Sequence, residues 1–229
     1  MALLSEQDAK TVREHLEKNL ADPVTLLYFT QTIACQFCRE TQQVLEEVAA
    51  LSDKVSLEVY NFVNDKETAD EYGVDKIPAT VVMGAKDYGV RFFGIPSGYE
   101  FTSLVEAVVA VSRGKVRLSE ATMAALAEIE EPIDIQVIVT PTCPYCPKAV
   151  QMAHSLAVAS DKISASMVEA IEFPHLAQKY GVQGVPRSIF TETVHLEGAA
   201  PEALYVAKLM QAAGKITQEE FDAMMGGDD

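Results

Sequence analysis

The chain has 229 residues, a formal net charge of −16 at pH 7 and a hydrophobic content of 48%. So acidic a chain has little cationic surface with which to neutralise phosphates, and this disfavours nucleic-acid binding. The apolar content is enough for one or two folded cores and argues against wholesale disorder.

The N-terminal sequence MALLSEQD turns polar after four residues and lacks the basic region and longer apolar segment of a signal peptide. No stretch approaches the roughly 18 consecutive apolar residues that a transmembrane helix needs. We therefore expect a cytoplasmic protein that does not enter a membrane.

In the first half of the chain, Ser5 and Asp8 form a capping pattern in front of an amphipathic helix. Gly73 and Gly114 are placed to end two later helices, and short apolar runs predict buried strands between the helices. The predicted helices span 6–20, 38–51, 65–72 and 97–112, and the predicted strands span 24–29, 55–62, 80–83 and 88–93.

The second half repeats this order of elements. The predicted helices span 118–129, 146–159, 174–180 and 201–213, and the predicted strands span 133–139, 166–171, 188–190 and 194–196. Thr217 and Glu220 form a capping box that opens one more short helix, 218–225. A docking or oligomerisation role and an inert tail are both open for this helix.

Landmarks of the two halves recur at one constant offset of 108 residues. These landmarks are Cys35 and Cys143, Tyr72-Gly73-Val74 and Tyr180-Gly181-Val182, and Pro78 and Pro186. Such a register indicates an internal duplication. We predict one domain over 1–114 and a second over 115–229, the second including the helical tail.

Each half has the order β-α-β, followed by a hairpin and a closing helix, with an extra helix in front. The β-α-β unit crosses over right-handedly and places its strands in parallel, and the hairpin then extends the sheet antiparallel. The predicted fold is therefore α/β, with two tandem thioredoxin-like domains, each a mixed central sheet flanked by helices.

The four cysteines fall in two Cys-x-x-Cys pairs, each placed where a strand ends and a helix begins. Unpaired backbone N–H groups and the helix dipole stabilise a thiolate at such a position. We predict that Cys35 and Cys143 attack disulfides and that Cys38 and Cys146 resolve the mixed disulfides.

Pro78 and Pro186 stand at matched distances after the two attacking cysteines, each in front of a predicted strand. In thioredoxin-like folds the peptide bond before this proline is cis and places the loop against the sulfur, although only about 5–6% of such bonds are cis by default. We predict cis bonds at both prolines as supporting elements of the two sites.

Glu169 ends the second central strand and is a candidate buried acid for proton transfer near Cys143. Glu172 is an alternative for the same role, and a solvated strand end is the competing interpretation. The counterpart of Glu169 in the first half is Asn61.

Other interpretations of the cysteines are a shared structural zinc, permanent structural disulfides, or one vestigial pair. Each pair has its own repeat and its own proline, which argues against a shared zinc, and a three-residue disulfide loop stabilises little. A vestigial pair stays open. We predict no metal and no bound cofactor, only redox-active disulfides.

The motif Cys143-Pro144-Tyr145-Cys146 resembles the glutaredoxin active site. Two fused thioredoxin folds, each with its own cysteine pair and cis-proline, resemble the protein disulfide oxidoreductases of thermophiles. The stretches 139–146, 168–171 and 87–94 are similar to that family, and the resemblance covers roughly residues 5–212. The sequence departs from thioredoxin itself, because Phe29 and Val137 replace the acid that precedes the first cysteine there.

This resemblance implies a cytoplasmic catalyst of dithiol–disulfide exchange that reduces, oxidises or isomerises disulfides in protein substrates. It also implies that electrons come from a thioredoxin-reductase-like flavoprotein, and it fits a thermophilic source. Whether glutathione takes part, and whether the protein is a monomer or a homodimer, stay open. The alternatives are a dedicated electron carrier to a peroxidase, and a redox-regulated chaperone or binding protein.

The two cysteine pairs enclose different residues, Gln36-Phe37 in the first and Pro144-Tyr145 in the second. Pro144 has no N–H group, so the backbone donors near each thiolate differ, and so should the reduction potentials. We hypothesise that Cys143 and Cys146 form the main redox pair.

Overall fold

The computed structural model describes residues 4–225, so the predictions for the first three and the last four residues lie outside the described part. Within that part the helices are α1 (Glu6–Asn19), α2 (Cys38–Ala49), α3 (Lys66–Glu71), α4 (Glu100–Arg113), α5 (Glu120–Ala127), α6 (Cys146–Ala159), α7 (Pro174–Lys179), α8 (Glu202–Ala212) and α9 (Gln218–Met225). The strands are β1 (Val24–Thr30), β2 (Val55–Asn61), β3 (Ala79–Met83), β4 (Asp87–Phe93), β5 (Ile133–Val139), β6 (Ile163–Glu169), β7 (Arg187–Ile189) and β8 (His195–Glu197).

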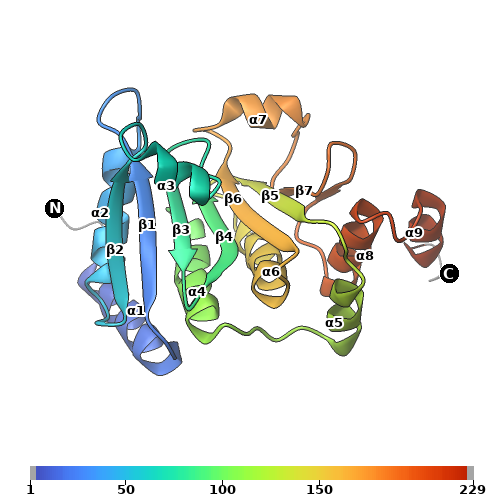
Figure 1. Ribbon diagram of the computed structural model, residues 1–229, viewed down its shortest axis with the longest axis horizontal. Helices are drawn as coiled ribbons and strands as arrows, with labels where there is room; N and C mark the ends of the chain where they lie inside the picture. Colours follow the sequence, from blue (N-terminus) through green and yellow to red (C-terminus); the bar gives the residue numbers. More distant parts are fainter. Residues whose placement is uncertain (1–3, 226–229) are drawn as a thin grey trace.

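All eight strands form one continuous sheet in the order β2-β1-β3-β4-β6-β5-β7-β8 (Figure 1). Each half contributes four neighbouring strands with the same internal order, as the repeat predicts. The halves join where β4 pairs with β6 in parallel, from Val90 opposite Ala165 to Phe93 opposite Val168. Strands β4 and β6 would otherwise be edge strands with unpaired backbone N–H and C=O groups. By pairing, each strand supplies the hydrogen-bond partners of the other.

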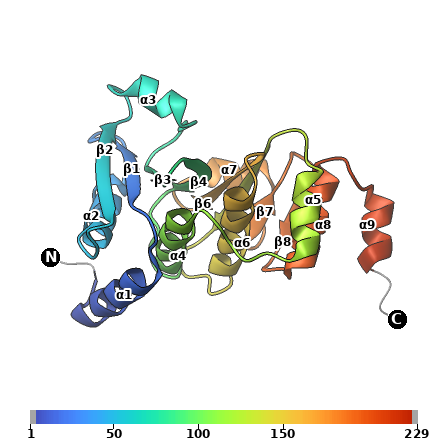
Figure 2. The same cartoon turned by 60° about the horizontal axis from the view of Figure 1, so that its bottom comes forward.

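Helices cover the two faces of the sheet unequally (Figure 2). Helices α3 and α7 lie over one face, where the smaller core runs across the seam and includes Phe93 and Val168. Helices α1, α2, α4, α6 and α8 pack on the other face around the larger core, which is also continuous between the halves. Helix α4 of the first half packs against α6 of the second.

Within residues 4–225, no helix has the length and apolar character needed to cross a membrane.

Most predicted boundaries agree with the structure within a few residues, and capping explains several of them. The hydroxyl of Ser5 accepts from the Asp8 N–H, and Thr217 and Glu220 form the predicted reciprocal capping box. Gly114 ends α4 in the left-handed conformation, with φ 57°.

Two boundaries differ from the sequence prediction. Strand β6 begins at Ile163 and ends at Glu169, earlier than the predicted span of 166–171, because its first residues pair with β5 from Ile133 onward. Helix α4 begins at Glu100 rather than at residue 97, because the preceding turn docks on the second half through a hydrogen bond from the Tyr99 N–H to the Pro141 carbonyl, at 3.0 Å.

The peptide bonds before Pro78 and Pro186 are both cis, which confirms the prediction for the two loops. The carbonyls of these prolines accept equivalent hydrogen bonds, from the Gly94 N–H at 2.9 Å and from the Gly198 N–H at 2.8 Å. The two halves therefore hold their proline loops in the same way.

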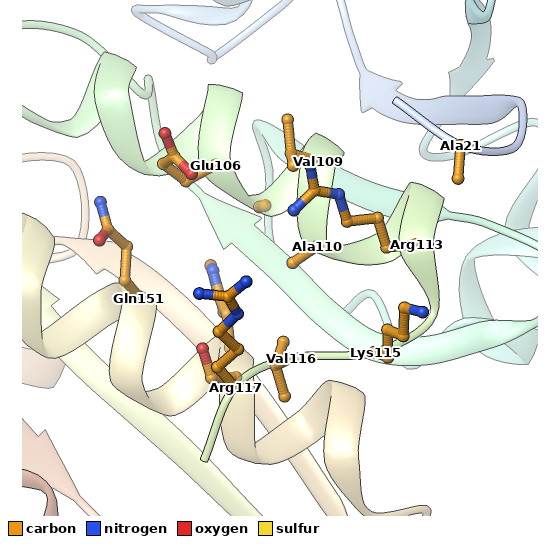
Figure 3. Close-up of a pocket in the computed structure, with 12 residues that line it drawn as sticks. Ala21, Glu106, Val109, Ala110, Arg113, Lys115, Val116, Arg117 and Gln151 are labelled. Carbon is orange, nitrogen blue, oxygen red and sulfur yellow. The ribbon is translucent and has the colours of Figure 1, made fainter. Parts of the chain in front are cut away.

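A cleft of about 640 Å³ lies at the seam between α4, the linker after it and α6 (Figure 3). Arg113, Lys115 and Arg117 line it, together with the amide of Gln151 from α6. These cations are close in sequence in a strongly acidic chain, and no cysteine lines the cleft. The cleft is therefore separate from both redox motifs.

Candidate active site

The second cysteine pair lies at the start of α6, where the structure begins the helix at Cys146. Cys143 is 8% exposed and Cys146 is fully buried, so only the first sulfur can meet an incoming disulfide. The thiol of Cys143 donates to the carbonyl of Val185, the residue before the cis-proline, at 3.6 Å. The structure thus brings the predicted attacking sulfur and the predicted Pro186 loop together.

Cys146 is held as a neutral thiol. Burial raises the pKa of Cys146, and the neighbouring Cys143 thiol and the Glu100 carboxyl group raise it further. A buried thiol of this kind is inert until a base removes its proton. Because the Glu100 carboxyl group acts electrostatically on Cys146, it is a candidate for that base.

Glu100 was not among the site residues predicted from the sequence. Its side chain is 1% exposed, and the one hydrogen-bond donor that acts on the carboxyl group within the described residues is the Ser103 hydroxyl of its own helix, which lowers its pKa only in part. Burial raises its pKa to about 7, so protonated and ionised forms coexist near neutral pH. In the sequence it resembles an ordinary acid in the first turn of a helix, where the helix dipole favours negative charge.

Helix α8 of the second half also begins with a glutamate, but that carboxyl group has partners. Glu202 accepts hydrogen bonds from the Ser119 N–H at 2.8 Å and from the Thr122 hydroxyl at 2.5 Å. It is therefore anchored to α5, whereas the donor that acts on the buried Glu100 is the Ser103 hydroxyl of its own helix. Of these two glutamates at helix starts, Glu100 in the first half is the one whose carboxyl group acts electrostatically on a cysteine pair, and that pair belongs to the second half.

Close contact between loops places Glu100 at this position. The N–H of Tyr99 donates to the Pro141 carbonyl, and a side-chain carbon added at Gly98 would lie 2.3 Å from the same oxygen. Gly98 also has a φ of 59°, a conformation that glycine adopts at low cost. Glycine at this position thus lets the turn before α4 rest directly on the loop that leads to Cys143.

The first cysteine pair has different surroundings. Cys35 and Cys38 form a disulfide with their Cα atoms 5.5 Å apart, whereas Cys143 and Cys146 are free thiols. Cys35 is half-buried and Cys38 is 3% exposed. The phenol of Tyr28 in β1 donates to the Cys38 carbonyl at 2.6 Å, which fixes the start of α2.

The predicted acid Glu169 is buried, at 2% exposure, and burial raises its pKa. One of its carboxyl oxygens accepts from the Glu172 N–H at 2.7 Å, and the Ile171 N–H also acts on the carboxyl group and lowers its pKa. Glu172 accepts from the Ile95 N–H at 2.6 Å, which links the two halves, and burial raises its pKa to about 7. Proton transfer by either carboxyl group stays a prediction.

Among residues 4–225, no group of three or more His, Cys, Asp and Glu side chains is arranged to hold a metal ion. The chemistry that the arrangement does support is thiol–disulfide exchange, because each pair combines a more accessible sulfur with a buried one three residues later.

The sequence profile of the thioredoxin domain matches the chain twice, over residues 29–106 and 133–211. A protein disulfide oxidoreductase from Aeropyrum pernix has a similar structure, with a TM-score of 0.85 and 30% identity, covering 93% of this chain and 95% of that one. The N-terminal domain of the alkyl hydroperoxide reductase AhpF from Enterococcus faecalis gives a TM-score of 0.83 and 26% identity, covering 90% of this chain and 99% of that one.

Curated relatives are longer than this chain. The alkyl hydroperoxide reductase AhpF from Escherichia coli is 26% identical over 92% of this chain and 38% of its own length. A Bacillus subtilis protein named NADH dehydrogenase is 26% identical over 80% of this chain and 31% of its own length. The chain thus spans about a third of the length of the curated relatives that it matches. Twofold matching to the domain profile and near-complete structural overlap together show that the chain belongs to the thioredoxin-domain family, as a tandem protein of the disulfide-oxidoreductase type.

Proposed function

We propose that this protein is a protein-disulfide oxidoreductase that exchanges electrons between its Cys-x-x-Cys pairs and disulfides or dithiols of protein substrates. The observation that carries the proposal is the arrangement around Cys143, whose thiol lies at the cis-proline loop with the buried Cys146 behind it. We assign the main redox role to this pair, because the buried carboxyl group of Glu100 acts on the thiol of Cys146.

In the reducing direction, the Cys143 thiolate attacks one sulfur of the substrate disulfide. The substrate S–S bond breaks, a Cys143–substrate disulfide forms, and the released substrate thiolate takes up a proton. Cys146 then loses its proton and attacks the Cys143 sulfur, which releases the second substrate thiolate. Two electrons pass to the substrate, and Cys143 and Cys146 end as a disulfide.

Glu100 is the proposed acceptor of the Cys146 proton. Its pKa of about 7 makes it a usable base at neutral pH, since a large fraction is ionised there and can take up a proton. Transfer of that proton removes the barrier set by the raised pKa of the buried Cys146 thiol. In the oxidising direction the same carboxylic acid returns the proton.

The proposed source of electrons is a thioredoxin-reductase-like flavoprotein, which would reduce the Cys143–Cys146 disulfide by two electrons. A second candidate function is a dedicated electron carrier to a peroxidase. The similarity to the N-terminal domain of AhpF favours this candidate, because that domain has the same tandem organisation. The cytoplasmic location stays a prediction.

Reduction of insulin by dithiothreitol tests the main proposal. The protein should accelerate the appearance of insulin B-chain turbidity, whereas an absence of acceleration would overturn the catalytic assignment. Suppressed aggregation without acceleration would favour a redox-regulated chaperone instead. Slow insulin turnover beside rapid peroxide-dependent oxidation, in the presence of a peroxidase and a flavoprotein reductase, would favour the carrier.

A further inference from the structure

A groove of about 850 Å³ borders both redox motifs. Its lining includes Phe37, which stands inside the first Cys-x-x-Cys motif, and Pro141, which lies two positions before Cys143. Ile171, just beyond the end of β6, adds a side chain from the second half. Both halves therefore build this groove, and a molecule in it would contact Phe37 of the first motif and the Pro141 loop that leads to Cys143.

The lining of the groove is mainly apolar. Side chains of α1, α2 and α4 contribute Val12, Val44, Phe101 and Val105. Ile171 is 67% exposed, so burial of this large apolar side chain against a partner lowers the free energy. Its repeat counterpart Val63 is equally exposed, at 66%, but does not line the groove. Of these two equivalent positions, only the one in the second half therefore offers an exposed apolar side chain to the groove.

The groove also contains a buried carboxyl group without a charged partner. Glu169 lines it and is 2% exposed, and the backbone N–H groups of Ile171 and Glu172 act on its carboxyl group. A basic side chain of a bound molecule supplies the charge-assisted hydrogen bond that these neutral donors do not. Asp8 and Glu40 are exposed acids of the same lining. The electrostatic field of the groove therefore favours a cationic partner.

The lining of the seam cleft of Figure 3 is mainly positive, although Glu106, which also borders the groove, lies on it. Arg113, Lys115 and Arg117 line that cleft, whereas no lysine or arginine of the described residues lines the groove beside the cysteines. A basic residue of a partner is therefore drawn to the groove and repelled from the seam cleft. The charge distribution thus distinguishes the two cavities by the partner that each favours.

We propose that the groove holds the polypeptide segment next to a substrate cysteine, with an apolar side chain against Ile171 and a lysine or arginine directed to Glu169. This inference rests on the proposed function and adds the class of substrate sequence. The volume is in the range that accommodates a few side chains rather than a folded domain. The favoured substrates are accordingly unfolded or locally extended chains that carry apolar and basic residues beside their cysteines.

Steady-state reduction of three disulfides tests the inference. They are a peptide with leucine and lysine beside its cysteine, the same peptide with serine and glutamine there, and oxidised 2-mercaptoethanol as a disulfide without flanking residues. Ile171→Ser should raise KM for the leucine–lysine peptide about tenfold, since burial of such a side chain contributes on the order of that factor. The matched variant Val63→Ser should leave it unchanged, and neither should alter reduction of oxidised 2-mercaptoethanol.

Glu169→Gln should lower the ratio of kcat/KM for the leucine–lysine peptide to kcat/KM for the serine–glutamine peptide. The reason is that an amide lacks the charge that attracts the lysine. If wild type reduces all three disulfides but Ile171→Ser and Val63→Ser have equal KM values, the groove assignment is wrong and the proposed function stands. If wild type reduces none of them, both are wrong. A dimer in light scattering that Ile171→Ser dissociates, without a change in KM, would show a contact between copies and overturn the inference.

Discussion

The carboxyl group of Glu100, in the first half of the chain, acts electrostatically on the thiol of Cys146, in the second half. The elements that carry the two groups are held together because α4 packs against α6 across the seam and because the turn at Tyr99 is hydrogen-bonded to Pro141. The candidate active site is therefore composite. Neither half alone contains both the cysteine pair and the buried acid beside it.

The first prediction concerns the rate at which Cys146 resolves a mixed disulfide. Glu100→Gln removes the proposed proton acceptor at nearly constant volume, so the resolution rate at a mildly alkaline pH should fall about 10²-fold, which is typical of a lost general base. Rapid-quench release of a substrate thiol from Cys143 measures this rate. In wild type the rate should increase as the pH rises through about 7, where Glu100 ionises.

Glu202→Gln is the matched control, because Glu202 is the first residue of α8 and is hydrogen-bonded to α5. It should change neither the rate nor its pH dependence. An unaltered rate and pH profile in Glu100→Gln would show that another group accepts the proton.

The second prediction concerns stability. The pKa of Glu100 is about 7 in the folded protein against 4.5 for an ordinary glutamate, so folding takes up a proton between these pH values. Stability should therefore fall as the pH rises through this window, with the loss complete above about pH 7. At about 1.36 kcal/mol per pKa unit, the effect is on the order of 3 kcal/mol.

Urea unfolding of wild type and Glu100→Gln, measured across a pH range from about 4.5 to about 8.5, checks this expectation. The variant should gain stability relative to wild type as the pH rises, because its amide does not titrate. Other raised carboxyl groups, including Glu172, remain in both proteins and cancel in the comparison. If the difference in unfolding free energy between the two proteins stays constant with pH, the assigned burial of Glu100 is contradicted.

The third prediction uses two glycines with the same backbone conformation. Gly73 and Gly98 have φ values of 65° and 59°, but only at Gly98 would an added side-chain carbon collide, at 2.3 Å from the Pro141 oxygen. Gly73→Ala should cost about 1 kcal/mol for the left-handed conformation. Gly98→Ala should cost a further 1–3 kcal/mol, roughly, for the collision. Equal losses in urea unfolding would show that the turn does not rest on the Pro141 loop.

Much of the architecture could be predicted because local signals agree with it. The register between Cys35 and Cys143 revealed the duplication, and the matched positions of Pro78 and Pro186 led to the correct prediction of two cis bonds. Capping patterns such as Thr217 with Glu220 set helix starts within a residue or two. These features depend on neighbours in sequence or on a repeat that is visible in sequence.

The features that escaped prediction depend on how the halves pack. Pairing of β4 with β6 joins the two sheets, yet no local pattern in Val90 or Ala165 announces a partner so distant in the chain. Glu100 has the position of a solvated acid at a helix start, yet its side chain is only 1% exposed in the folded chain. Of the two interpretations of Glu169, a buried acid or a solvated strand end, the structure agrees with the buried acid, and its role in proton transfer stays a prediction.

The most direct test of the central claim compares insulin reduction by Cys143→Ser and Cys35→Ser. Each variant removes the more accessible sulfur of one pair, and serine preserves the size of the side chain. If the composite site at Cys143 is the main redox centre, Cys143→Ser should abolish turnover while Cys35→Ser retains most of it. Loss of turnover in Cys35→Ser alone, with Cys143→Ser fully active, would contradict the account.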